Sequence, residues 1–227
     1  MPQNGVHAMA GIVARRWMPH REWLLLGLVL GNMFPDLDNL AVAYATLTGG
    51  DTHGLHRTFT HSIFTVVAVI LLFYLVAALK NDLRWNNLGL GLGIGILMHA
   101  LLDLILWFNG VEIFWPIRYE VNFWKWVTVP DWFGIILQTG EFLAFGLYFL
   151  LLISLARRQR TDVGHHSTVK IWMYIQFVLF VVFTVAFFTL GAQGLPYIIF
   201  GALYLISMIV AIVLTIRMRK TVEALPS

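Results

Sequence analysis

Carboxylates and imidazoles recur at short spacings in the first half of this chain. Asp36 and Asp38 follow Pro35, and His56 and His61 come some twenty residues later. Carboxylate oxygens and imidazole nitrogens are ligands that zinc and other transition ions accept in proteins. These side chains therefore predict a metal site. The chemistry expected of such a site is hydrolysis by a metal-activated water.

A third pair, His99 and Asp103, lies inside a long apolar stretch. The two residues are four positions apart, so in a helix their side chains share one face about one turn apart. A charged side chain at bilayer depth costs roughly 2.5–3.5 kcal/mol on insertion scales, so such a pair calls for a compensating role. We expect both residues to ligate a metal. The alternative is a buried hydrogen-bonded couple.

The composition is typical of a membrane protein. Of the 227 residues, 59% are hydrophobic and 12% are charged, whereas soluble domains carry about 25% charged residues. No linker divides the chain, so we expect a single integral membrane domain over residues 1–227. Cysteine is absent, which excludes disulfides and thiolate zinc sites. Basic residues stand at the ends of apolar segments, a pattern of membrane topology rather than of nucleic-acid binding.

Five apolar segments are long enough to cross a bilayer, which takes about 20 residues per helix. They are Ser62–Leu79, Leu88–Phe108, Trp132–Ala156, Ile171–Leu190 and Leu195–Ile216. Two shorter pieces, Val6–Met18 and Glu22–Phe34, precede them. The second piece either continues as Leu37–Leu47, in a crossing broken at Pro35, or forms a re-entrant hairpin with the first. The predicted fold is all-α, a polytopic bundle of five or six spanning helices plus a short or re-entrant N-terminal helix.

The basic loops predict an orientation. The most basic connection, from Arg157 to Lys170, is expected to be cytoplasmic. Tracing the chain back from it puts the loop 109–131 outside and starts a helix near His61 at the outer side. His99 then falls in the outer half of its helix. We therefore expect the site to face the non-cytoplasmic side of a bacterial or archaeal cell membrane.

Three further features bear on function. Arg57 lies between the two loop histidines, and a guanidinium suits bidentate recognition of phosphate, although it also serves as a surface anchor or a carboxylate partner. The glycine run Gly89–Gly95 lacks the strand context of a nucleotide-binding loop and predicts close helix packing. The loop 109–131 is rich in aromatic rings, which predicts either an ordinary interfacial belt or an entrance for lipid. These rings are Phe114, Trp115, Phe123, Trp124 and Trp126.

Four motifs in this order resemble the YdjM-like (LexA-regulated) family of membrane-bound metal-dependent hydrolases. They are an N-terminal histidine (His7), PDxD (Pro35, Asp36, Asp38), HRxxTHS (His56, Arg57, Thr60, His61, Ser62) and HxxxD (His99, Asp103). Trp115-Pro116, after Asn109-Gly110, is similar to the segment that follows in the family. The resemblance spans about residues 7–116, the expected metal-site region, and leaves the helices over 132–216 outside it. Thr58 stands where the family usually has glycine, which implies a different local turn.

The resemblance implies how the ligands are shared out. The primary metal site is expected to consist of Asp36, His61, His99 and Asp103. A second ion would be bound by His7, Asp38 and His56, or these residues would surround the ligands of the first ion. The residues expected to serve catalysis are Arg57 and Asp38. Zinc is the expected metal, with manganese or iron as alternatives.

The family is similar in its motifs to secreted zinc-dependent phospholipase C and to related single-strand nucleases. Those relatives hold a third metal through downstream histidines. Here no histidine occurs between His99 and His165, so one or two ions are expected.

The predicted function is that of a membrane-embedded hydrolase acting on a lipid or other phosphoester, with membrane lipid as its partner. Two alternatives use the same ligands: a metal or ion transporter, and a non-catalytic membrane protein whose metal holds its helices together. Transport requires ionisable residues through the depth of the membrane. The last two helices carry no acidic or basic residue between Ile171 and Ile216, which argues against transport.

Overall fold

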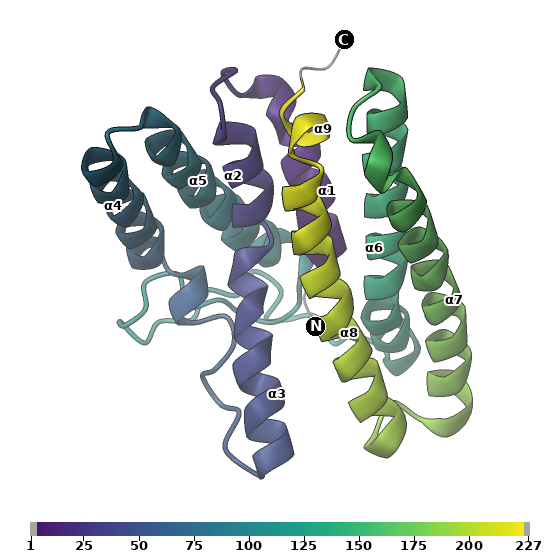
Figure 1. Cartoon of the computed structure of the whole chain (residues 1–227). Helices are drawn as coiled ribbons and strands as arrows, with labels where there is room; N and C mark the ends of the chain where they lie inside the picture. The colour runs from purple at the N-terminus through teal and green to yellow at the C-terminus, as the bar shows by residue number, and fades with distance from the viewer. Residues whose placement is uncertain (1–3, 225–227) are drawn as a thin grey trace. The chain divides into compact units, whose positions relative to one another are not determined.

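Long helices dominate the computed structural model, which describes residues 4–224. Within this part, five helices are long and apolar enough to span a bilayer (Figure 1). They are α4 (Ile63–Lys80), α5 (Leu83–Leu106), α6 (Asp131–Gln159), α7 (His166–Leu190) and α8 (Gly194–Arg217). The five predicted crossings are confirmed, and the protein is an integral membrane protein.

The chain divides into two compact units. One unit holds α6, α7 and α8 together with the first turn of α1 (Asn4–Ala14). The other runs from His7 to Val127 and holds α4, α5 and all the shorter helices between α1 and α4. Both units contain helices that could span a bilayer, so neither is a soluble appendage.

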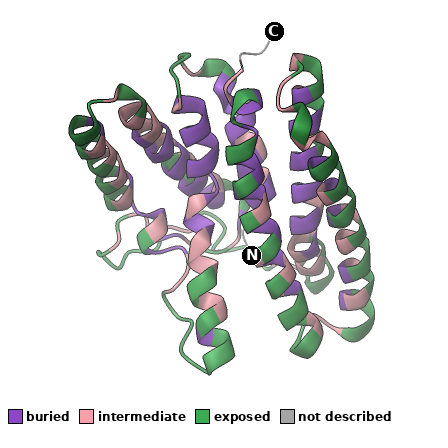
Figure 2. Ribbon diagram, in the orientation of Figure 1, coloured by how far each residue is buried: buried purple, intermediate pink, exposed green. Residues whose placement is uncertain are grey.

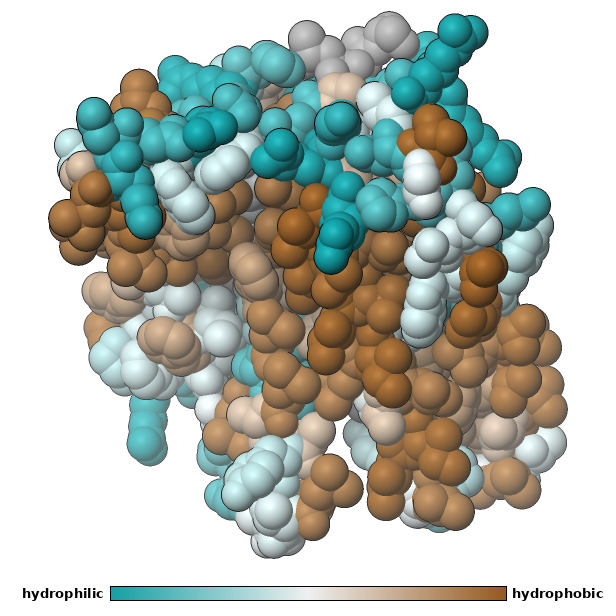
Figure 3. All heavy atoms as spheres, in the orientation of Figure 1, coloured by the Kyte–Doolittle hydropathy of each residue, from teal (hydrophilic) through white to brown (hydrophobic). Residues whose placement is uncertain are grey.

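Aromatic side chains form the core of the unit built from α6, α7 and α8. Phe142 of α6, Phe183 of α7 and Phe200 of α8 lie with ring centroids 5.0–5.6 Å apart. In Figure 3, hydrophobic side chains cover the length of α8, and hydrophilic ones gather towards its end near α9 (Arg219–Glu223). Glu141 of α6 is fully buried and accepts a hydrogen bond from the Gly5 amide at 3.4 Å, so it meets the start of α1.

In the other unit, a short helix is interrupted and then resumes. α2 (Leu24–Gly31), the 3₁₀ helix η2 (Phe34–Asp38) and α3 (Asn39–Thr48) follow one another in the same direction (Figure 1). The chain therefore continues helically past Pro35, which is one of the two alternatives that the sequence left open. α2 also packs against α1, because a Cβ on Gly11 would lie only 3.0 Å from the Cα of Val29.

Glycines bring α2 and α5 into backbone contact. A Cβ added to Gly91 or Gly95 of α5 would collide with the backbone of α2, and one added to Gly27 or Gly31 of α2 would collide with the backbone of α5. Small residues at this spacing let membrane helices approach closely. The packing role predicted for Gly89–Gly95 is confirmed. Figure 2 shows the result: α2 is buried along its whole length, whereas α4 is mostly exposed.

Candidate metal centre

All seven predicted ligands lie in one cluster, inside the unit that runs from His7 to Val127. The cluster consists of three overlapping groups, and within each group the ligand atoms lie within 4.8 Å of one another. The groups are His7, His99 and Asp103; Asp36, His61 and His99; and Asp38, His56 and His61. His99 and His61 each belong to two groups, so the cluster is continuous.

One face of α5 carries both the glycine contact and two of the ligands. Gly91, Gly95, His99 and Asp103 follow at four-residue intervals, which places them on the same side of the helix. His99 Nδ1 lies 2.7 Å from the backbone carbonyl of Asn32, at the end of α2. A carbonyl only accepts, so Nδ1 carries the hydrogen and Nε2 of the neutral ring keeps a lone pair for a metal.

The two aspartates after Pro35 belong to different groups. An extended segment would have pointed both carboxylates the same way, but residues 34–38 form the 3₁₀ helix η2, in which neighbours at this spacing diverge. Asp36 Oδ1 lies 3.6 Å from His99 Nε2, whereas Asp38 Oδ1 lies 2.6 Å from His56 Nδ1. Asp38 precedes α3 without capping it, since its side chain makes no capping hydrogen bond.

Asp38 is held by several donors and in turn orients His61. It accepts hydrogen bonds from the Thr60 hydroxyl at 2.7 Å and from the Arg57 amide at 3.2 Å. Because Thr60 gives its only hydrogen to Asp38, its oxygen accepts from His61 Nδ1 at 2.9 Å. His61 Nε2 is then unprotonated. Burial lowers the pKa of His61, which favours this neutral form.

A left-handed residue turns the chain between the two loop histidines. Arg57 has a φ of 60°, and the short 3₁₀ helix η3 (Phe59–His61) follows it. The turn brings the rings of His56 and His61 to 5.4 Å between centroids, as their spacing requires. Thr58 itself has a φ of −116°, which needs no glycine.

Four atoms that carry lone pairs meet at the middle of the cluster. His61 Nε2 and His99 Nε2 are 3.1 Å apart, and Asp103 Oδ2 lies 3.5 Å from the former. Asp36 Oδ1 is the fourth atom, and all four residues are at most 1% exposed. With both imidazoles protonated at Nδ1, these atoms repel one another unless a cation lies among them. Two imidazoles and two carboxylates fit a divalent transition ion.

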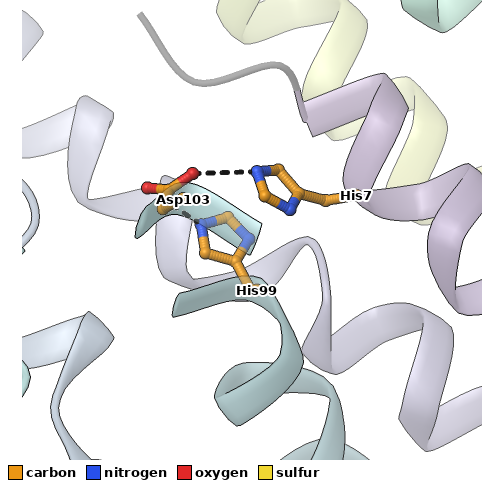
Figure 4. A group of neighbouring side chains, drawn as sticks. All are labelled: His7, His99 and Asp103. Carbon is orange, nitrogen blue, oxygen red and sulfur yellow. Dashed lines mark hydrogen bonds and ion pairs between the residues drawn. The ribbon is translucent and has the colours of Figure 1, made fainter. Parts of the chain in front are cut away.

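His7 joins this arrangement from α1. Its Nε2 lies 3.0 Å from Asp103 Oδ1, and its ring stacks on His99 with centroids 3.8 Å apart. Figure 4 shows His7 pointing from α1 towards the two α5 residues. His7 thus contacts the carboxylate oxygen opposite to the one that faces His61.

Arg57 lies beside the same carboxylate. Its Nε is 3.2 Å from Asp103 Oδ2, and its NH1 donates to the Asn109 carbonyl at 3.3 Å. The guanidinium carbon lies 5.7 Å above the centroid of the Trp107 ring. Trp107 was not predicted from the sequence, and its place four positions after Asp103 was the signal that could have found it; it is the extended residue that directly follows α5. Asn32 was also missed, and because it contributes a backbone carbonyl, its residue type gave no signal.

The aromatic loop, residues 109–131, is hydrogen-bonded to the turn that carries Arg57 and His61. The Glu112 amide donates to the Arg57 carbonyl at 3.0 Å, and the Ser62 hydroxyl donates to the Trp115 carbonyl at 2.8 Å. Ser62 also caps α4 by accepting from the Phe64 amide. Phe123 and Trp126 are 61% and 88% exposed. The loop therefore joins the centre to a set of exposed aromatic rings.

Four other histidines and one buried glutamate lie outside the described ligand groups. His20 and His53 are exposed. His165 and His166 lie in the connection between α6 and α7, and Glu141 belongs to the unit built from α6, α7 and α8.

A family model described as YdjM inner membrane protein matches residues 4–195. The match covers most of the chain and includes every ligand of the cluster. Neither the curated proteins nor the solved structures gave a match.

Proposed function

The chain belongs to the YdjM inner membrane protein family, and we propose that it is a membrane-embedded, metal-dependent hydrolase of lipid-borne phosphoesters. One observation carries the proposal. His61 Nε2 and His99 Nε2 are 3.1 Å apart and face two buried carboxylates. This donor set fits zinc best, with one or two ions, and manganese or iron as alternatives. Such an ion lowers the pKa of a bound water to about 7 and polarises a phosphoryl oxygen.

The protein's own groups supply the other roles. Arg57 neutralises negative charge that develops on the phosphoryl oxygens, as a preorganised cation does in a dry site. His56 gives its Nδ1 hydrogen to Asp38 and keeps the lone pair of its buried Nε2, which has no hydrogen-bond partner among residues 4–224. Its side chain is 22% exposed, more than that of any other ligand in the cluster. We assign His56 and Asp38 to proton transfer or to a second ion.

Two features support a lipid as the source of the phosphoester. The ligands stand at the opposite ends of α4 and α5 from the basic residues Lys80 and Arg84, and basic ends are cytoplasmic by the positive-inside rule. The loop beside the site exposes aromatic rings of the kind that settle among lipid headgroups. The substrate would then reach the site from the outer leaflet of the membrane.

Ion transport is the second candidate, because the helical run of α2, η2 and α3 is interrupted at the ligands Asp36 and Asp38. Discontinuous helices carry the ion sites of many transporters. A transport path would have to continue towards the basic ends of the helices. There the glycines of α2 and α5 bring the two backbones into contact, and α4 carries no charged residue between Ile63 and Leu79. Hydrolysis is therefore the stronger proposal.

The test combines metal analysis with hydrolysis. The purified protein is analysed for bound metal and assayed on a phospholipid panel and on bis(p-nitrophenyl) phosphate, beside His99→Ala and Asp103→Ala. We expect one or two ions per chain and measurable turnover, with both variants losing metal and activity. His53→Ala is the matched control, because His53 is exposed and outside the cluster.

Each rival predicts a different result. Metal retained without turnover on any substrate supports a structural metal site, and zinc uptake into proteoliposomes without turnover supports transport. Activity that survives in both variants would refute the assignment of the centre.

A further inference from the structure

Three buried N–H donors beside the metal centre make no hydrogen bond within the described part of the chain. They are Arg57 Nε, Arg57 NH2 and Trp107 Nε1, and of these Arg57 Nε faces Asp103 Oδ2 at 3.2 Å. Arg57 is 5% exposed and Trp107 is 6% exposed, so neither side chain is hydrated as a surface group would be. The guanidinium carbon lies 5.7 Å over the centroid of the indole ring, so the two side chains are neighbours. Buried donors are normally paired, and an unpaired one destabilises the fold.

We propose that Arg57 and Trp107 form a binding subsite for the phosphoryl oxygens of the substrate, with Trp107 Nε1 as a specific hydrogen-bond donor. This inference rests on the proposed hydrolase and names the residues that would bind the phosphoryl group of its substrate. Guanidinium and indole nitrogens only donate, so their ligand must be rich in acceptors. A phosphoryl group offers two non-bridging oxygens, whereas an acyl ester offers a single carbonyl. The pair therefore favours a phosphoester over a carboxylic ester.

The backbone around Arg57 holds its side chain in place. The amide of Arg57 donates to Asp38 and its carbonyl accepts from the Glu112 amide. On the side chain, NH1 is engaged by the Asn109 carbonyl and Nε faces Asp103. NH2 is thus the guanidinium nitrogen of Arg57 that remains to donate a hydrogen bond to a ligand. A donor fixed in this way binds an oxyanion without first having to be ordered.

Charge makes this subsite depend on the metal. The cluster contains three carboxylates, those of Asp36, Asp38 and Asp103, against the single cation of Arg57. With neutral histidines this balance is negative and repels an anion. One divalent ion cancels this net negative charge, and a second ion makes the net charge positive. Oxyanion binding is therefore expected only in the metal-loaded protein.

The inference is tested by binding rather than by turnover. Inorganic phosphate is titrated calorimetrically into the full-length protein, with and without equimolar zinc, beside Trp107→Phe. This substitution keeps an aromatic face beneath the guanidinium and removes the N–H. We expect phosphate to bind only with zinc, and about tenfold more weakly in Trp107→Phe, as fits the loss of one hydrogen bond to a charged group. Trp126→Phe is the control, since Trp126 is 88% exposed on the loop 109–131, and it should bind like the wild type.

A second arm identifies the source of the phosphoryl group. The titration is repeated in nanodiscs of phosphatidylglycerol and in nanodiscs of a phosphate-free galactolipid. If lipid headgroups enter the subsite, phosphate binds more weakly in the phospholipid discs, and this difference shrinks in Trp107→Phe. Equal affinity in both discs identifies free phosphate or a soluble phosphoester as the ligand.

The two proposals fail in different ways. Unchanged phosphate affinity in Trp107→Phe, with its metal content and melting temperature intact, overturns the subsite and leaves the hydrolase standing. So does the absence of phosphate binding to an active, zinc-loaded wild type. Phosphate binding that depends on Trp107, without turnover of any phosphoester, upholds the subsite and refutes the hydrolase.

Discussion

Replacing Gly95 by alanine tests whether the α2–α5 contact positions the metal centre. A Cβ at this position would lie 2.7 Å from the Cα of Gly31 and 2.8 Å from the amide nitrogen of Asn32. Both neighbours are backbone atoms, so no side chain can turn away to make room. Carbon atoms in contact are about 3.5–4.0 Å apart, so α2 must move away by roughly 0.8 Å or more.

This displacement reaches the site directly. Asn32 gives its carbonyl to His99 Nδ1 at 2.7 Å, and His99 is one helical turn beyond Gly95. Functional sites tolerate about 0.5 Å of misplacement, and loss of a hydrogen bond that orients a ligand lowers metal affinity about 10–100-fold. We expect Gly95→Ala to lower the zinc affinity by about this factor. Overpacking costs about 1–3 kcal/mol and is partly offset by the gain of about 1 kcal/mol from alanine in a helix, so stability should change less clearly than metal affinity.

The assay is zinc affinity by competition with a fluorescent chelator, with the melting temperature followed by intrinsic tryptophan fluorescence. Gly93→Ala is the matched control on the same helix, because its Cβ would meet the end of the flexible Ile70 side chain on α4. Gly201→Ala is a second control, with no atom within 4 Å of its Cβ. Both controls should bind zinc like the wild type. Wild-type affinity in Gly95→Ala would refute the view that this contact positions His99.

Three further predictions concern the centre itself. Thr60→Val keeps the side-chain shape but removes the hydroxyl that joins Asp38 to His61, and it should lower zinc affinity about 10–100-fold; an unchanged affinity would show that Asp38 orients His61 alone. Removing the metal with a chelator should lower the melting temperature by roughly 5–10 °C when zinc was present at about 100 times its Kd, and readdition should restore it. Arg57→Gln removes a cation 3.2 Å from Asp103, so zinc should bind several-fold more tightly while phosphoester turnover falls; a parallel loss of metal would contradict this reading.

The spanning helices and the ligand types could be predicted because each depends on local sequence. Hydropathy alone locates α4 to within a residue at each end. Hydropathy fails at the start of α5, which begins at Leu83 rather than Leu88. The predicted crossing began after the polar residues Asn86 and Asn87, but Asp82 caps the helix earlier by accepting from the Arg84 amide. A cap extends a helix through residues that hydropathy excludes.

The division of labour among the ligands could not be predicted, because it depends on backbone conformation and distant contacts. Spacing alone cannot show whether residues 34–38 are extended or 3₁₀, and this choice sends Asp36 to His99 and Asp38 to His56. The left-handed conformation of Arg57 is equally invisible, since arginine does not favour it. It follows from the contacts of its amide and carbonyl with Asp38 and Glu112.

The position of Arg57 argues against a purely structural metal. A structural ion needs only ligands, and these come from helices in close contact with one another. Arg57 faces the carboxylate oxygen that also faces His61, where its charge repels a metal cation and competes for a ligand. A site that served only to hold helices together would be stronger without it. The guanidinium is useful there if a second anion, beyond the Asp103 carboxylate, must approach both it and the metal, as the proposed hydrolysis of a phosphoester would require.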